Sequence, residues 1–145
     1  MKLTRHIILL AVACVGLVMA SCDKKDCNGD LDGMWQLTLW TSPQGDTIAT
    51  KDSMIFYSVQ LKMMNFKKNM SPMLNINSSF EKYSEAIRVF DPIVYQNNGH
   101  DSIYPMSVLQ SMGVPEDGVM RIESLTSGKL ILSSATEGTL RFRKY

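Results

Sequence analysis

The sequence predicts an all-β domain, an antiparallel barrel or sandwich of about eight strands with one short helix. Short runs in which apolar and polar side chains alternate recur along the chain from Gly33 to Tyr145. Residues typical of turns separate these runs, and a basic and aromatic run, "GTLRFRKY", closes the chain. Alternation with a period of two is the pattern of a strand that buries one face, so hairpins are expected to follow one another.

The first predicted strand lies in the stretch "DLDGMWQLTLW". Trp35, Leu37 and Leu39 fall on one face of a strand with this register, while Gln36 and Thr38 fall on the other. Successive side chains of a strand point to opposite faces, so the three large apolar residues are expected to enter the core together.

The later strands follow the same pattern, with many β-branched and aromatic residues. They are expected within residues 53–66, 86–90, 121–125, 129–134 and 138–145. Turns are expected at residues 43–46, 97–99, 115–118 and 137–138. These turns carry the proline, glycine, asparagine and aspartate residues that reverse the chain most readily.

One segment has the spacing of a helix. Met106, Leu109 and Met112 recur at intervals of three residues, Pro105 precedes them and Gly113 follows them. Proline is favoured at the start of a helix and glycine just after its end. A helix of about two turns is therefore predicted before the last two hairpin strands.

The N-terminus has the composition of an export signal. Lys2 and Arg5 precede the apolar run 7–20, and residues 1–21 are interpreted as a signal peptide. The run has about fourteen residues, fewer than the roughly 18 to 20 that span a bilayer. A short membrane anchor or a buried N-terminal helix is the alternative.

The end of this leader, "VMASC", resembles the lipobox of bacterial lipoproteins. Ala20 and Ser21 occupy the small positions before Cys22, and Met19 stands where the family most often has leucine. The resemblance implies cleavage before Cys22, which would then carry acyl chains and anchor the protein to the membrane of the cell envelope, most simply the outer membrane of a Gram-negative cell. Residues 22–32 are charged and are expected to form a flexible stalk. "CDKKD" loosely resembles a surface-display signal, so the periplasmic and surface faces both stay open.

Composition excludes several classes of protein. The chain has 15 basic and 14 acidic residues, a balance that gives no electrostatic basis for binding nucleic acid. Without its leader the chain keeps one histidine, His100, and one cysteine besides Cys22, Cys27. This supply is too small for a metal site, and no catalytic triad or phosphate-binding loop is present, so neither an enzyme nor a cofactor is expected. His100 lies in "NNGHDS", which is interpreted as a hairpin tip.

Gly33-Met34-Trp35 matches the short G-x-W motif in the first strand of lipocalins and related barrels. In that family the tryptophan closes one end of the barrel, and an arginine from the last strand packs across it. Arg141 and Arg143, in the final run, are the candidates for this role. The conjunction with the lipobox resembles small lipocalin-like envelope lipoproteins and implies an up-and-down barrel over residues 33–145. The helix departs from the family, because in lipocalins it follows the eighth strand.

Methionine is abundant, with nine residues left when Met1 and Met19 are removed with the leader. Flexible, polarizable methionine suits surfaces that adapt to varied apolar ligands, although it also fills gaps in small cores. Met54, Phe56, Met63 and Phe66 are the candidates for lining an apolar cavity. Two functions stay open: binding of a small apolar or amphipathic molecule without catalysis, or a structural role in which the outer surface docks a larger envelope or nutrient-uptake complex.

Overall fold

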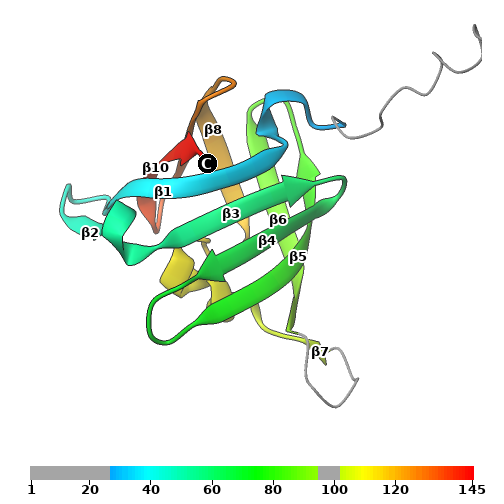
Figure 1. Cartoon of the computed structure of the whole chain (residues 1–145), viewed down its shortest axis with the longest axis horizontal. Helices are drawn as coiled ribbons and strands as arrows, with labels where there is room; N and C mark the ends of the chain where they lie inside the picture. The colour runs from blue at the N-terminus through cyan, green and yellow to red at the C-terminus, as the bar shows by residue number, and fades with distance from the viewer. Residues whose placement is uncertain (1–26, 95–101) are drawn as a thin grey trace, which may run out of the picture.

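The chain folds into a closed antiparallel barrel of eight strands (Figure 1). The computed structural model describes residues 27–94 and 102–145. The barrel strands are β1 (Gly33–Thr41), β3 (Ile55–Gln60), β4 (Met63–Lys68), β5 (Leu74–Lys82), β6 (Ala86–Val94), β8 (Val119–Leu125), β9 (Lys129–Ser134) and β10 (Gly138–Lys144). Two short strands, β2 (Thr47–Thr50) and β7 (Ser102–Ile103), pair with β1 and β6.

Pairing of the first strand with the last closes the barrel. Residues 35–41 of β1 lie antiparallel to residues 139–144 of β10, and Trp35 is the register partner of Lys144. Each remaining barrel strand pairs with the strands before and after it, which is an up-and-down order. Closure gives every barrel strand a paired neighbour on each side. The predicted fold class is therefore confirmed, and the sandwich alternative is wrong.

A bulge changes the face of the second half of β1. The register with β10 shifts between Leu37 and Leu39, so Thr38 is the extra residue. Trp35 and Leu37 point into the core as predicted, but Trp40 replaces Leu39 there and is 5% exposed. The Trp40 indole Nε1 donates to the carbonyl oxygen of Glu137 at 2.6 Å. Strict alternation cannot foresee such a bulge.

Two features of the sheet lie outside the predicted pattern. The apolar stretch 53–66 contains two strands, because the chain reverses at Leu61 and Lys62 between β3 and β4. No glycine, proline or asparagine marks this turn. Strand β5 follows at Leu74–Lys82, where asparagine and serine interrupt the apolar residues and weaken the strand signal.

The predicted helix is confirmed in position, although it is a 3-10 helix. It is η3 (Met106–Met112), which follows Pro105 and ends at Gly113 in the left-handed conformation. Two shorter 3-10 helices are η1 (Gly29–Leu31) and η2 (Lys51–Ser53). Among the described residues no helix is long and apolar enough to cross a membrane.

The second half of the predicted stalk is folded. Leu31 of η1 is fully buried, and Asn28 binds Asp32 through both its backbone and its side chain at 3.0 and 2.6 Å. The Asn28 amide also donates to the carbonyl oxygen of Leu61 at 2.8 Å. The globular part therefore begins near Asn28 rather than at Gly33.

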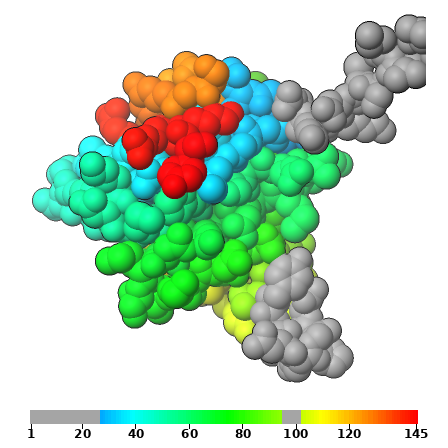
Figure 2. All heavy atoms as spheres, in the orientation of Figure 1, coloured from blue at the N-terminus to red at the C-terminus, as the bar shows by residue number. Residues whose placement is uncertain are grey.

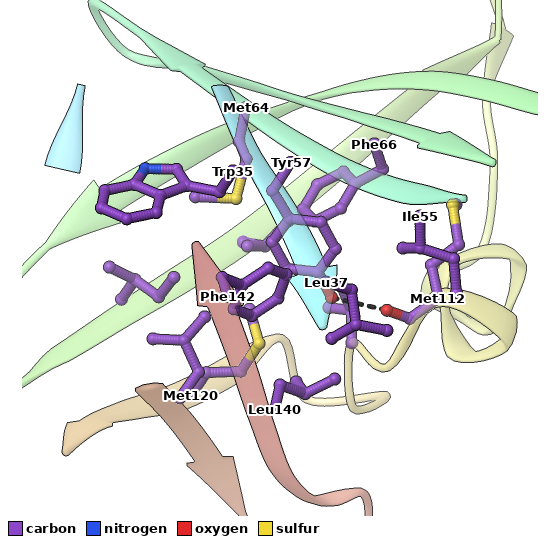
Figure 3. Close-up of a cluster of buried hydrophobic side chains, with 14 of the residues drawn as sticks. Trp35, Leu37, Ile55, Tyr57, Met64, Phe66, Met112, Met120, Leu140 and Phe142 are labelled. Atoms are coloured by element: carbon purple, nitrogen blue, oxygen red, sulfur yellow. Dashed lines mark hydrogen bonds between the residues drawn. The ribbon is translucent and has the colours of Figure 1, made fainter. Parts of the chain in front are cut away.

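The core fills the inside of the barrel. Tyr57 is fully buried in its centre, and its ring lies 4.6 Å from the rings of both Phe66 and Phe142 (Figure 3). Apolar side chains from all eight barrel strands join one buried cluster. Among the largest are Trp35, Leu37, Ile55, Met64, Ile76, Ile87 and Met120. Contact among side chains of this size occupies the space that could hold one small ligand in an eight-stranded barrel.

Candidate functional site

The barrel has two different ends. Antiparallel pairing brings together Gly33, the turns at 61–62, 83–85 and 126–128, and the C-terminus. We call this end of the barrel the closed end. The mouth is the opposite end, with β2, η2, η3 and the connection between β4 and β5 at residues 69–73. Figure 1 shows η1 beside the turns of the closed end.

Trp35 plugs the closed end, as the G-x-W motif predicts. Its side chain is fully buried, and its indole Nε1 donates to the carbonyl oxygen of Leu31 at 2.8 Å. The cation over the ring is Lys144, whose Nζ lies 4.7 Å from the ring centroid and donates to the carbonyl oxygen of Asp30 at 2.9 Å. A Cβ on Gly33 would stand 2.7 Å from Lys144 Cε. Gly33 has φ +115°, which favours glycine, and its lack of a side chain leaves room for Lys144 to reach across the tryptophan.

The prediction that an arginine covers Trp35 is wrong. Arg143 lies on the outer face of β10, where its guanidinium donates to Gln36 Oε1 at 2.8 and 3.0 Å. Arg141 is also exposed, and its backbone oxygen accepts from Thr38 Oγ1 at 2.9 Å. Alternation along β10 turns both arginines outward, because Leu140 and Phe142 occupy the inner face.

Of the four predicted ligand-lining residues, only Phe66 points into the barrel, where it is part of the packed core. Phe56 is buried on the outer face, and its ring meets the Tyr145 ring edge to face at 5.4 Å. Met54 and Met63 are 37% and 43% exposed. The structure therefore does not bring these four side chains together around a cavity.

The registers of β3 and β4 explain why the predicted residues do not meet around a cavity. In β3 and β4 the inner face carries Ile55, Tyr57, Val59, Met64 and Phe66, so residues one position away from Phe56 and Met63 are buried. A shift of one residue moves every side chain of a strand to the other face. The apolar run 53–66 is continuous, and its sequence does not show which set faces inward.

Tyr57 ties the barrel interior to the helix at the mouth. Its hydroxyl donates to the carbonyl oxygen of Met112, the last residue of η3, at 2.6 Å (Figure 3). Burial raises the pKa of this hydroxyl far above the ordinary value for tyrosine, and the negative charge of Glu137 raises it further. Leu109 and Met112 of η3 are fully buried in the core, so η3 covers the mouth end of the barrel.

A hollow remains at the mouth, between η3, β2 and the end of β4. It has a volume of about 320 Å³. We call it the mouth hollow; it is lined by Trp40, Ile48, Ala49, Ser53, Ile55, Lys68, Met70, Ser71 and Ser111. The buried side chains of Trp40, Ala49 and Ile55 form its apolar floor, while serine hydroxyls and Lys68 supply the polar part of its lining. Its size lies at the lower end of the range for small-molecule sites, about 300 to 1,000 Å³.

Lys68 is the charged residue of the mouth hollow. It is the last residue of β4, pairs with Ile55 and Leu74, and is half-buried while its neighbour Lys67 is exposed. Within residues 27–94 and 102–145 the ion pair that the structure contains is that of Arg121 with Glu123. The Lys68 amino group therefore has no carboxylate partner in the described part of the chain.

Across residues 27–94 and 102–145, no group of three histidine, cysteine or carboxylate side chains is placed to hold a metal ion. Tyr83 has a raised pKa because its hydroxyl donates to Glu81 at 2.7 Å, at an exposed turn. Cys22 and His100 lie outside the described residues. Cys27 is exposed with a free thiol.

Solved structures share this architecture. A lipocalin-like protein from Bacteroides uniformis superposes with a TM-score of 0.61 at 22% identity, over 81% of this chain and 100% of that one. An uncharacterised protein from Bacteroides eggerthii gives 0.59 at 19% identity, over 79% and 99% of the two chains. Both likenesses concern the fold alone. Among curated proteins, none matches the chain.

The sequence itself carries the family relationship. The family model of the lipocalin-like domain matches residues 17–145, which includes every strand of the barrel. The match agrees with the closed up-and-down barrel and with the glycine and tryptophan at the start of β1. The protein belongs to the lipocalin-like domain family.

Proposed function

We propose that this protein is a lipid-anchored lipoprotein of the cell envelope whose barrel binds one small amphipathic molecule in the mouth hollow, without catalysis. The observation that carries the binding proposal is the half-buried Lys68, which stands without a carboxylate partner among the described residues beside an apolar floor. A cation beside apolar surface favours an amphipathic ligand that brings its own negative charge, because a hydrogen bond between opposite charges is stronger than one between neutral groups.

The chemistry of the hollow defines the ligand class. Trp40, Ala49 and Ile55 supply apolar surface, and Met70 at the rim is flexible enough to adapt to different shapes. An apolar body with one acidic group, such as a medium-chain fatty acid, satisfies both the floor and Lys68. The filled centre of the barrel would leave such a ligand at the mouth rather than deep inside.

Calorimetric titration with decanoate tests this proposal. Lys68→Gln is expected to weaken binding by a factor on the order of ten, since a hydrogen bond to a charged group contributes roughly 1.5–3 kcal/mol. Lys67→Gln, one residue away on the outer face, is the matched control and should leave binding unchanged. Equal affinities of the two variants, or no heat with the wild-type protein, would refute the site.

The lipid anchor rests on "VMASC" and has its own test. Cells that grow with radiolabelled palmitate are expected to label the wild-type protein and the Cys27→Ala variant but not Cys22→Ala. This pair of variants separates the proposed acylated cysteine from the exposed Cys27 five residues later. Absence of label from the wild-type protein, or label on Cys22→Ala, would overturn the anchor and leave the ligand site untouched.

A second function is favoured by the packing of the core. Tyr57, Phe66 and Phe142 occupy the barrel centre, as expected of a barrel that serves as a scaffold and docks a larger envelope complex through its outer surface. Lys68 would then have no ligand to bind. A panel of fatty acids and other amphipathic anions that gives no heat of binding would favour this scaffold role.

A further inference from the structure

Two hairpin tips at the closed end expose apolar side chains. Leu61 in the turn between β3 and β4 is 52% exposed, and Tyr83 in the turn between β5 and β6 is 51% exposed. Lys62 and Lys82 stand next to them in the sequence. We call these four residues the closed-end rim. They line one hollow of about 680 Å³, whose wall includes Phe80 and Phe90.

Leu61 is in a conformation that leucine rarely adopts. Its φ is +56°, in the left-handed region, within a two-residue turn between β3 and β4. Glycine is favoured at such positions because it has no Cβ to crowd the backbone, and asparagine because its short polar side chain can hydrogen-bond locally. A leucine that is both strained and half in water is unfavourable in the isolated protein, so its benefit is expected to come from a partner that covers it.

The N-terminal chain leaves the domain at the same place. Cys27 Sγ donates to the carbonyl oxygen of Leu61 at 3.4 Å, and Lys82 Nζ donates to the carbonyl oxygen of Asn28 at 3.1 Å. Figure 2 shows the described chain beginning at this edge of the molecule. From Cys22 to Cys27 a fully extended chain reaches about 18 Å. An acylated Cys22 would therefore hold the closed end close to the bilayer.

We propose that the closed-end rim rests on the membrane surface, with Leu61 and Tyr83 in the headgroup region and Lys62 and Lys82 beside lipid phosphates. This inference rests on the anchor in the proposed function for its geometry. Leucine and tyrosine at turn tips are suited to this layer, and nearby lysines are attracted to anionic lipid. Glu81 also lines the hollow and is held by the Tyr83 hydroxyl. The mouth hollow would then face away from the membrane.

The test uses the acylated full-length protein in vesicles of equal parts phosphatidylcholine and phosphatidylglycerol with brominated acyl chains, which quench nearby tryptophan. Tyr83→Trp is expected to be quenched well beyond the wild-type background of buried Trp35 and Trp40. Met73 lies at the other end of the barrel and is 74% exposed, so Met73→Trp is the matched control. Its fluorescence should not be quenched beyond the wild-type background. Equal quenching of the two variants would overturn the proposal.

Leu61→Asn separates membrane contact from folding. Asparagine tolerates a positive φ, so this change is expected to raise the midpoint of denaturant unfolding while it lowers the quenching of Tyr83→Trp about twofold. A variant that keeps full quenching would show that Leu61 does not touch lipid.

If palmitate labelling fails, the same quenching measurement is made on unacylated protein mixed with the vesicles. Quenching of Tyr83→Trp in the unacylated protein would support membrane contact by the closed-end rim without the lipid anchor. Absence of quenching would contradict both the membrane contact and the lipid anchor.

Discussion

Tyr57 connects the packed core of the barrel with the 3-10 helix η3 at the mouth. It lies between two aromatic rings, and its hydroxyl is the described partner of the Met112 carbonyl oxygen. The sequence placed Tyr57 in a strand but did not single it out, because a tyrosine that anchors a helix across a barrel leaves no local pattern. Only the closed sheet brings residues 57, 66 and 142 together.

Tyr57→Phe is expected to lower the free energy of unfolding by about 1–3 kcal/mol, because it leaves the Met112 carbonyl buried without a partner. Tyr145→Phe is the matched control, since Tyr145 is 71% exposed, and it should leave stability nearly unchanged. Urea unfolding monitored by circular dichroism measures both. Identical stabilities of the two variants would mean that the hydroxyl contributes nothing.

The raised pKa of Tyr57 also predicts how the free energy of unfolding changes with pH. Above the ordinary tyrosine pKa of 10.0 the unfolded chain loses this proton while the folded protein keeps it. The unfolded state then binds fewer protons, so stability falls as pH rises above 10. The wild-type protein should lose stability more steeply than Tyr57→Phe between pH 10 and pH 11, and parallel curves would contradict the burial of this hydroxyl.

At the scale of elements, the junction of β1 with β10 decides whether the barrel closes. Trp35 and Gly33 were recognisable in the sequence, and the structure places both at the start of β1 beside Lys144 of β10. The cation was misassigned, because the choice among Arg141, Arg143 and Lys144 depends on which residues of β10 face inward. The bulge at Thr38 was equally invisible, and it placed Trp40 rather than Leu39 in the core.

Gly33→Ala tests this junction. The residue has φ +115°, and an added Cβ would stand 2.7 Å from Lys144 Cε. The change is expected to lower the free energy of unfolding by about 1–3 kcal/mol, since it adds backbone strain and displaces the lysine from Trp35. Gly128 lies in a turn at the same end, and a Cβ added there would have no heavy atom within 4 Å. Gly128→Ala should therefore lower the free energy of unfolding only slightly in the same urea titration. A cost for Gly128→Ala as large as that for Gly33→Ala would argue against a special role for Gly33.

For the whole molecule, the sequence predicted the fold class, the closing tryptophan and the helix, because each depends on local pattern or on a short motif. It left open whether the barrel would be hollow or filled, and it did not predict that η3 would cover the mouth. Those features depend on which register each strand adopts, and the continuous apolar run 53–66 fits two registers. Met54, Phe56, Met63 and Phe66 were therefore expected around a cavity. In the structure only Phe66 of these four faces inward, where it packs in the core with Tyr57 and Met64.

The central claim is that a ligand binds at the mouth and not in the barrel centre. Methyl NMR spectra of the protein titrated with decanoate test it most directly. We expect shifts at Ile48, Ala49, Ile55 and Met70, which line the mouth hollow, with Met64 and Leu132 in the core unchanged. Shifts that begin at Met64 and Leu132, or equal shifts throughout, would show that the ligand enters the interior and would contradict the account.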